Sequence, residues 1–259
     1  QLLVRLAYAC EIQGLTQARA AEVFGITRLR VNKALSDARE RGIVRVSINS
    51  PLGPCVELEA ALIEEFGIEP GEGPLAIVVS RLTAQKGLDL LHDALPGLLA
   101  GGGMLALLGS GDPGLENAYR ELAARHGQVG VRIGYDEALS HRMIAGGDAI
   151  LVPSRFEPCG LTQLYGLRYG AVPIVAYTGG LIDTVIPDTP MATRAGVTTG
   201  LQFHPITSDA LAQALMRAVS LFADQATWEK MQKNGMKQPV GWGPSACEYA
   251  GLYRELVGT

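Results

Sequence analysis

From Leu75 onward the chain alternates short apolar runs with helical patterns, and this alternation restricts its fold more than any other feature. The short, mainly apolar runs, which read as strands, are residues 75–80, 104–108, 129–133, 149–153 and 171–176, and the fourth of them reads as a buried parallel strand. The helical patterns cover residues 87–99, 114–125, 137–146, 207–222, 226–235 and 244–257. Repeated strand–helix units of this kind predict an α/β domain with a parallel sheet, flanking helices and right-handed crossovers.

The stretch from Ser154 to Gln163 (SRFEPCGLTQ) joins the fourth apolar run to a helical pattern that begins near Gly160. It therefore lies at the carboxyl end of a strand, where open α/β sheets bind their ligands. Glu157 brings a carboxylate to this loop, and the N–H groups of Leu161 and Thr162 would face an anion at the helix N-terminus. A carboxylate beside a helix end suits a sugar nucleotide, because it offers one group for hydroxyls and another for phosphate.

This stretch closely resembles the signature of bacterial glycogen and starch synthases, the retaining glucosyltransferases that use ADP-glucose. Further motifs match the same family in the same order: VSRLTAQKG at 79–87, LGSGD at 108–112, IGYDE at 133–137 and TGGLIDTV at 178–185. The match covers residues 70–259 and corresponds to the C-terminal half of those enzymes. The resemblance implies a single Rossmann-like domain of the GT-B type that works without a metal or another cofactor.

The resemblance also implies roles for the residues of these loops. Arg81, Lys86 and Glu157 would be catalytic, since two cations would stabilise the departing diphosphate and the carboxylate would hold glucose hydroxyls. The other nucleotide-sugar-binding residues would be Gly109, Gly111, Tyr135, Cys159, Gly160, Leu161, Thr162, Thr178, Gly179 and Gly180. Simpler explanations stay open for some of them: a solvated Arg81, a tight turn at Gly109, and a half-buried Tyr135 that stacks on no base.

The N-terminal part of the chain has a different pattern. Residues 3–13 read as an amphipathic helix, and residues 15–35 have the spacing of a helix-turn-helix. Gly25 can take the positive φ of the tight turn, and Thr27 can cap the second helix. A turn and an alternating strand at 41–49 would add a wing. The segment resembles the DNA-binding domain of SorC-type and DeoR-like bacterial sugar regulators.

The N-terminal segment is basic, whereas the rest of the chain is acidic. Residues 1–50 carry 8 Lys or Arg and 4 Asp or Glu, whereas the remaining residues carry 14 and 22. The residues that would face DNA from the second helix are Arg28, Arg30, Asn32 and Lys33. Arginine and lysine suit phosphate contacts, and arginine or asparagine suits base edges, so residues 15–41 are a candidate DNA-binding segment. A small helical domain whose arginines are merely solvated is the alternative.

These patterns divide the chain into a helix-turn-helix domain (1–52), a junction helix and linker (53–74) and the synthase-like domain (75–259). In the synthases an N-terminal domain supplies a Lys-x-Gly-Gly loop and a catalytic histidine, and no lysine of this chain is followed by x-Gly-Gly. We therefore expect ADP-glucose or ADP as ligand and an α-glucan as acceptor, but little or no transfer by this chain alone. Two alternatives are a regulator that senses the sugar nucleotide and a fusion without joint function.

The amino-acid composition restricts the classes of protein to which this chain can belong. The chain is 47% hydrophobic and 19% charged, which suits a globular α/β protein. It contains no run long enough for a membrane helix and no signal-peptide pattern, so we expect a cytoplasmic protein. The 4 cysteines are scattered without a C-x-x-C pair, which argues against a zinc site. Helix-turn-helix domains often dimerise, so a homodimer is an open alternative.

Overall fold

The computed structural model describes residues 2–12, 15–40 and 53–258. They belong to two compact units, Gln1–Gly53 and Pro54–Thr259, each with a hydrophobic core of its own. Among the described residues, no helix is both long and apolar enough to cross a membrane.

Helices make up the described part of the first unit. They are α1 (Leu2–Ala7), a π-helical turn (Tyr8–Ile12), α2 (Gln17–Phe24) and α3 (Arg28–Glu40). The Thr16 side chain accepts a hydrogen bond from the Arg19 N–H and caps α2, whereas Gly25, with a φ of 62°, ends it. The two predicted helices are therefore joined by the predicted turn. The predicted wing at 41–49 lies outside the described residues.

The first unit has a small core. Its fully buried side chains are Leu6, Ala20, Val31 and Ala38, and Leu35 is nearly so. Val31 and Leu35 lie on the inner face of α3, as the spacing of apolar residues predicts. The N-terminal helix is shorter than expected, because regular α-helix ends at Ala7 and the chain continues as the π-helical turn.

A six-stranded parallel sheet forms the centre of the second unit. Its strands are β1 (Leu75–Val79), β2 (Met104–Gly109), β3 (Val129–Ile133), β4 (Ala149–Val152), β5 (Val172–Ala176) and β6 (Leu201–Phe203). The spatial order is β3-β2-β1-β4-β5-β6, and every neighbouring pair is parallel. This is the strand order of a doubly wound Rossmann sheet. The parallel sheet is confirmed, and the short edge strand β6 is an addition.

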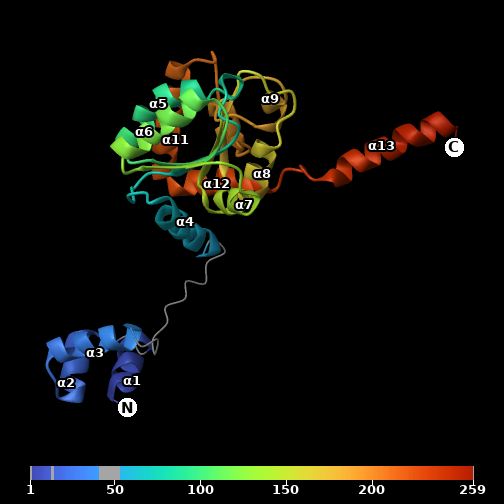
Figure 1. The fold of residues 1–259 in the computed structure, drawn as a ribbon. Coiled ribbons are helices and arrows are strands. Elements are labelled where there is room, and N and C mark those ends of the chain that lie inside the picture. Colours follow the sequence, from blue (N-terminus) through green and yellow to red (C-terminus); the bar gives the residue numbers. More distant parts are fainter. Residues whose placement is uncertain (1, 13–14, 41–52, 259) are drawn as a thin grey trace. The chain divides into compact units, whose positions relative to one another are not determined.

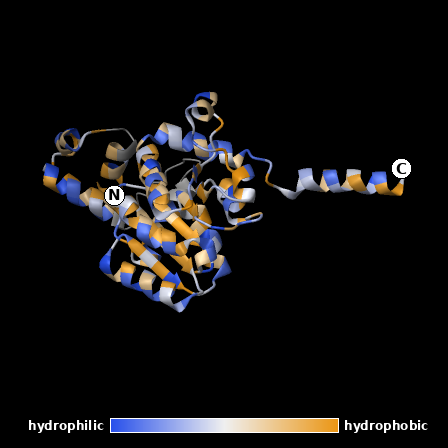
Figure 2. Ribbon diagram, turned by 90° about the horizontal axis from the view of Figure 1, so that it is seen from above, coloured by the Kyte–Doolittle hydropathy of each residue, from blue (hydrophilic) through white to orange (hydrophobic). Residues whose placement is uncertain are grey.

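Helices cover both faces of this sheet. The described helices of this unit are α4 (Gly53–Phe66), α5 (Leu88–Ala100), α6 (Pro113–Arg125), α7 (Glu137–Gly146), α8 (Thr162–Tyr169), α9 (Gly180–Thr184), α10 (Pro190–Ala195), α11 (Ser208–Ala223), α12 (Gln225–Met236) and α13 (Trp242–Val257). Helix α13 has no buried residue and is not one of the helices that cover the sheet. Figure 1 shows α5, α6 and α11 on one side of the sheet and α7 and α8 on the other. The strands between them are strongly hydrophobic (Figure 2).

The side chains of successive strand residues point alternately into two different hydrophobic cores. Ala76 and Val78 point into the core under α5, α6 and α11, whereas Leu75 and Ile77 point into the core under α4 and α7. Leu62 of α4 is 1% exposed within that second core. The helix that the sequence analysis set apart as a junction is thus packed on the sheet as part of the second unit.

Candidate active site

The topology directs attention to one point on the carboxyl edge of the sheet. From β1 the chain proceeds outward to β2 and β3, then returns to place β4 on the other side of β1. Doubly wound sheets bind ligands in the crevice at such a switch point, because the loops diverge there. The two loops at this position follow β1 (residues 80–87) and β4 (residues 153–161), and they contain the three residues predicted to be catalytic.

Lys86 and Glu157 meet at the switch point. Lys86 Nζ lies 2.5 Å from Glu157 Oε2, and the same oxygen accepts a hydrogen bond of 3.1 Å from Ser154 Oγ. The two side chains are only 21% and 13% exposed. Because Lys86 ends a short 3₁₀ turn (Ala84–Lys86), its position is fixed by local backbone as well as by the carboxylate.

A third loop packs against the loop that carries Glu157. The Gly180 N–H donates to the carbonyl oxygens of Glu157 (3.2 Å) and Pro158 (3.0 Å). Gly179 has a φ of 46°, and a Cβ there would collide with the Glu157 carbonyl, so only glycine allows this approach. Thr178 Oγ1 reaches the Arg155 carbonyl at 3.5 Å. The predicted residues Thr178, Gly179 and Gly180 therefore border the same site.

Helix α8 begins at this site with an open N-terminus. Leu161 occupies the N-cap position and makes no side-chain capping bond, so the first N–H groups of the helix face the crevice edge without a side-chain partner. The buried Gln163 amide donates to the carbonyls of Cys159 (3.1 Å) and Gly160 (2.9 Å), which fixes the turn before the helix. The sequence pattern predicted that this helix begins near Gly160. In the structure the regular helix begins two residues later, at Thr162.

A cavity of about 230 Å³ lies beside the switch point, at the carboxyl ends of β1, β2 and β3. Its lining residues are Val79, Ser80, Arg81, Leu108, Gly109, Ser110, Gly134, Tyr135, Asp136 and Ser140. The cavity therefore brings together Arg81, Gly109 and Tyr135, which the sequence predicted as site residues. Tyr135 is 85% exposed, and its hydroxyl donates a long bond of 3.4 Å to Glu137.

Gly111 belongs to the same edge of the sheet without lining the cavity. The Leu82 N–H donates to the Ser110 carbonyl (3.0 Å), and the Asp112 N–H donates to the Leu82 carbonyl (2.8 Å). Gly111 lies between these bonds, where a Cβ would collide with the Leu82 backbone. The loops after β1 and β2 are thus joined to each other close to Arg81.

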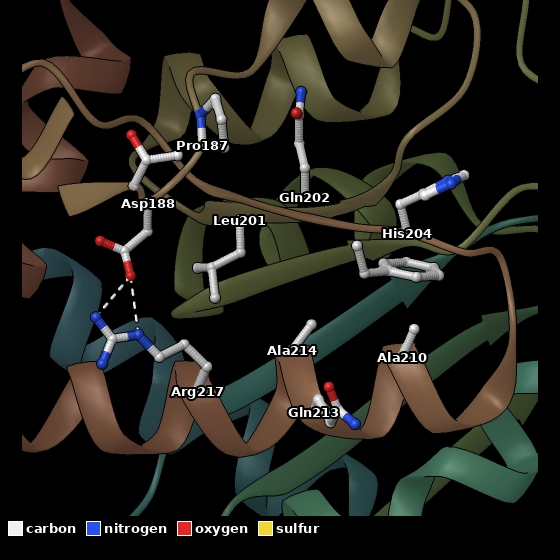
Figure 3. A pocket seen from close by; sticks show the side chains of 11 residues that line it. Pro187, Asp188, Leu201, Gln202, His204, Ala210, Gln213, Ala214 and Arg217 are labelled. Atoms are coloured by element: carbon white, nitrogen blue, oxygen red, sulfur yellow. Dashed lines mark hydrogen bonds and ion pairs between the residues drawn. The ribbon is translucent and has the colours of Figure 1, made fainter. Parts of the chain in front are cut away.

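Another cavity, of about 310 Å³, lies between the edge strand β6 and helix α11. Figure 3 shows its labelled side chains, with Asp188 and Arg217 paired on one side. It contains none of the residues that the sequence predicted for the site. In the described part of the chain, no group of three or more His, Cys, Asp or Glu side chains could hold a metal ion.

A family model for the glycosyl transferases of group 1 matches residues 62–238 of this chain. The chain belongs to the group 1 glycosyl transferases. The matched range contains the whole sheet and all three loops described above, so the candidate site lies within the glycosyl transferase domain.

Curated relatives of this glycosyl transferase chain are named glycogen synthases. The glycogen synthase of Cereibacter sphaeroides (strain ATCC 17025) is 54% identical over 257 residues, which is 98% of this chain and 53% of that protein. The glycogen synthase of Paracoccus denitrificans is 61% identical over 198 residues, which is 76% of this chain and 42% of that protein. The chain thus spans about half the length of the curated relatives it matches.

A solved structure agrees with these relatives. The catalytic domain of starch synthase IV from Arabidopsis thaliana, bound to ADP and acarbose, is 33% identical with a TM-score of 0.72. It covers 79% of this chain, and the chain covers 43% of it. The resemblance to glycogen and starch synthases is therefore confirmed for the glycosyl transferase domain, and the GT-B-like fold with it.

Sequence reasoning missed the side chains that hold the site of this glycosyl transferase together. Arg155 lies inside the signature stretch, yet its partner Asp89 is 66 residues away in the sequence. Ser154, which is 1% exposed, and Gln163, which is 0% exposed, were likewise seen only as parts of a motif. The pairing of Arg155 with Asp89 had one signal in the sequence. Arg155 follows β4 and Asp89 begins the helix after the β1 loop, and parallel strands bring such loops to the same edge of the sheet.

Proposed function

We propose that this chain is the donor-binding half of a glycogen synthase-type glucosyltransferase and binds ADP-glucose at the carboxyl edge of its sheet. The observation that carries the proposal is the contact between Lys86 and Glu157 at the switch point of a group 1 glycosyl transferase domain. A nucleotide sugar needs a cation for its diphosphate next to an acceptor for its sugar hydroxyls, and this pair supplies both in one place.

The other residues suit the remaining parts of the donor. The adenine would enter the 230 Å³ cavity and stack on the exposed ring of Tyr135. The diphosphate would lie between Arg81, Lys86 and the open N-terminus of α8. As the glycosidic bond breaks, negative charge grows on the leaving phosphate, and the two cations would stabilise that charge.

Glucose would then lie next to Glu157, with the Gly179 N–H as the backbone donor, because the N–H groups of Thr178 and Gly180 already donate to backbone carbonyls. The loop from Thr178 to Gly180 packs on the Glu157 backbone, so the carboxylate and this donor would reach the sugar from the same side. No resident metal or cofactor enters this proposal, because the charge of the leaving group is met by arginine, lysine and helix N–H groups. The ligands are ADP-glucose, ADP and an α-glucan acceptor.

We further propose that this chain alone transfers little or no glucose. It matches about half of each glycogen synthase, and none of its lysines precedes x-Gly-Gly. Holding two reactants in register and closing the site over them account for much of an enzyme's rate. An acceptor that meets only the donor half loses both contributions.

The first test is thermal denaturation with and without ADP-glucose. Ligand at 100 times its Kd should add about 2.7 kcal/mol to the stability of the unit that binds it, whereas glucose alone should add none. A parallel assay follows the transfer of radioactive glucose from ADP-glucose to glycogen. Rapid transfer by the purified chain would contradict the half-enzyme proposal, and the absence of any stabilisation would contradict donor binding.

A second candidate function is DNA binding by the first unit, as in a regulator that senses the sugar nucleotide. The observation in its favour is the exposure of Arg28, Arg30, Asn32 and Lys33 on α3, directly after the turn at Gly25. Exposed cations at the start of the second helix suit phosphate and base contacts.

A gel-shift experiment with the DNA upstream of the chain's own gene tests this candidate. Binding should weaken as salt rises, and Arg28→Ala/Arg30→Ala should abolish the shift while Arg217→Ala leaves it unchanged. Relief of the shift by ADP-glucose would support the regulator. A shift that ignores ADP-glucose would instead support two units without joint function, and no shift would exclude this candidate.

A further inference from the structure

Arg155 holds two loops of the candidate site together through its backbone and its side chain. The Arg155 N–H donates to the Gln85 carbonyl at 2.9 Å, and Arg155 Nη1 donates to the Ala84 carbonyl at 2.6 Å. Gln85 and Ala84 belong to the loop after β1, whereas Arg155 belongs to the loop after β4. These bonds therefore cross the switch point of the sheet.

The same guanidinium forms a two-point ion pair with Asp89 in the first turn of α5. Nη1 lies 2.6 Å from Oδ1, and Nη2 lies 2.6 Å from Oδ2. Hydrogen bonds from Arg155 hold the pKa of Asp89 below its usual range, so the carboxylate stays charged. A bidentate pair of this kind fixes orientation as well as distance.

The position of these contacts in the sequence gives them a function. Arg155 forms hydrogen bonds on both sides of Lys86 in the sequence. It bonds to Ala84 and Gln85 before Lys86 and to Asp89 after it. Glu157 follows Arg155 by two residues. Whatever fixes Arg155 on this loop therefore also fixes the separation between Lys86 and Glu157.

We propose that the Arg155–Asp89 pair is a positioning device that sets Lys86 against Glu157 and thereby preorganises the donor site. The part of this inference that concerns donor affinity depends on the proposed function; the positioning of the two loops does not. Arg155 touches no reacting group, so it is a positioning residue and not a catalytic one.

Exposure separates this role from a purely structural one. The two side chains are 38% and 41% exposed, and ion pairs at that exposure add little to global stability. A positioning pair should therefore affect the site far more than the melting temperature. A merely stabilising pair would change both together, and a superfluous pair would change neither.

The test uses Arg155→Lys, which keeps the charge but cannot make the two-point contact, and Asp89→Asn, alone and combined. Arg217→Lys serves as the matched control, because Arg217 pairs with Asp188 beside the other cavity (Figure 3). Each variant is measured by calorimetric titration with ADP-glucose, by thermal denaturation and by hydrogen exchange at the amides of Arg155 and Lys86. Lys86 donates its own N–H to the Thr83 carbonyl at 3.0 Å, so both amides report on the loops.

We expect each single variant to weaken ADP-glucose binding about 10-fold and the double variant to weaken it no further, because the two side chains act as one unit. Both amides should exchange about 10-fold faster, and the melting temperature should change by less than about 2 °C. Arg217→Lys should change neither the affinity for ADP-glucose nor the exchange of these two amides. Unchanged exchange in Arg155→Lys would overturn the inference, as would fully additive losses of affinity. If the wild-type chain binds no ADP-glucose, the proposed function fails, and hydrogen exchange alone decides for or against the positioning role.

Discussion

Lys86 Nζ and Glu157 Oε2 lie 2.5 Å apart although 71 residues separate them in the sequence. The contact exists because β1 and β4 are adjacent parallel strands whose loops emerge at the same edge of the sheet. The cation and the carboxylate neutralise each other in a largely buried position. A ligand that enters here must offer negative charge to one and hydroxyl donors to the other.

Glu157→Gln tests the division of labour between these two groups. We expect affinity for ADP-glucose to fall about 10-fold, since hydrogen bonds to a charged acceptor are worth about 1.5–3 kcal/mol. Affinity for ADP, which has no glucose, should not fall, because Lys86 is left free for phosphate. Equal losses for both ligands in calorimetric titrations would show that Glu157 does not contact the sugar.

Tyr135→Ala tests the base-binding cavity. Because the ring is 85% exposed, its removal costs little packing, but it takes away a stacking surface worth about 1–3 kcal/mol for a bound base. We expect ADP and ADP-glucose to weaken equally, by about 10-fold. Tyr135→Phe is the matched control and should bind like wild type, since the hydroxyl makes only the long bond to Glu137. Wild-type affinity in Tyr135→Ala would exclude stacking on this ring.

Leu62→Ala tests whether α4 is an integral part of the glycosyl transferase unit. Leu62 is buried in the core with Leu75, Ile77 and Met104, and truncating such a leucine leaves a cavity. We expect the free energy of unfolding of this unit to fall by about 2–5 kcal/mol in urea denaturation. Ala61, on the exposed side, offers Ala61→Ser as a control with little effect. A helix that only links two units would tolerate both changes.

Asp148→Asn tests a pH dependence at the opposite end of the sheet. Burial, with a smaller contribution from the Glu59 charge on α4, raises the pKa of Asp148 to about 7. The folded state therefore holds a proton that the unfolded chain has already released, so stability should fall as pH rises from about 4 to about 7.

In Asp148→Asn this loss should be absent, because the amide oxygen can still accept the 2.8 Å bond from the Leu75 N–H without carrying a charge. We expect the variant to be more stable than wild type by about 1–3 kcal/mol at pH 8 and similar to it near pH 4. The check is urea denaturation of both proteins across this pH range. Parallel pH profiles would mean that Asp148 keeps an ordinary pKa in the folded chain.

Much of this fold follows from local patterns, because β1, β2, β4 and β5 are buried on both faces and read as apolar runs. The edge strand β6 was not predicted, because Leu201–Phe203 is too short to show an alternation of apolar and polar residues. The π-helical turn at Tyr8–Ile12 was also missed, because its apolar spacing resembles that of an α-helix.

The candidate site was predictable only in part. Lys86 and Glu157 stood out because each follows an apolar run, which places a loop at the carboxyl edge of a sheet. Their direct contact, and the pairing of Arg155 with Asp89, depend on which strands become neighbours. That order is set by the packing of the whole sheet, so spacing in the sequence does not reveal it.

The most direct test of the central claim is calorimetric titration of the purified chain with ADP-glucose, beside an Arg81→Ala/Lys86→Ala variant and an Arg217→Ala control. The account predicts saturable binding in the wild type and the control, and its loss in the double variant, because the diphosphate then meets neither cation. Binding of equal strength in all three proteins, or none in the wild type, would contradict the assignment of the switch point as a donor site.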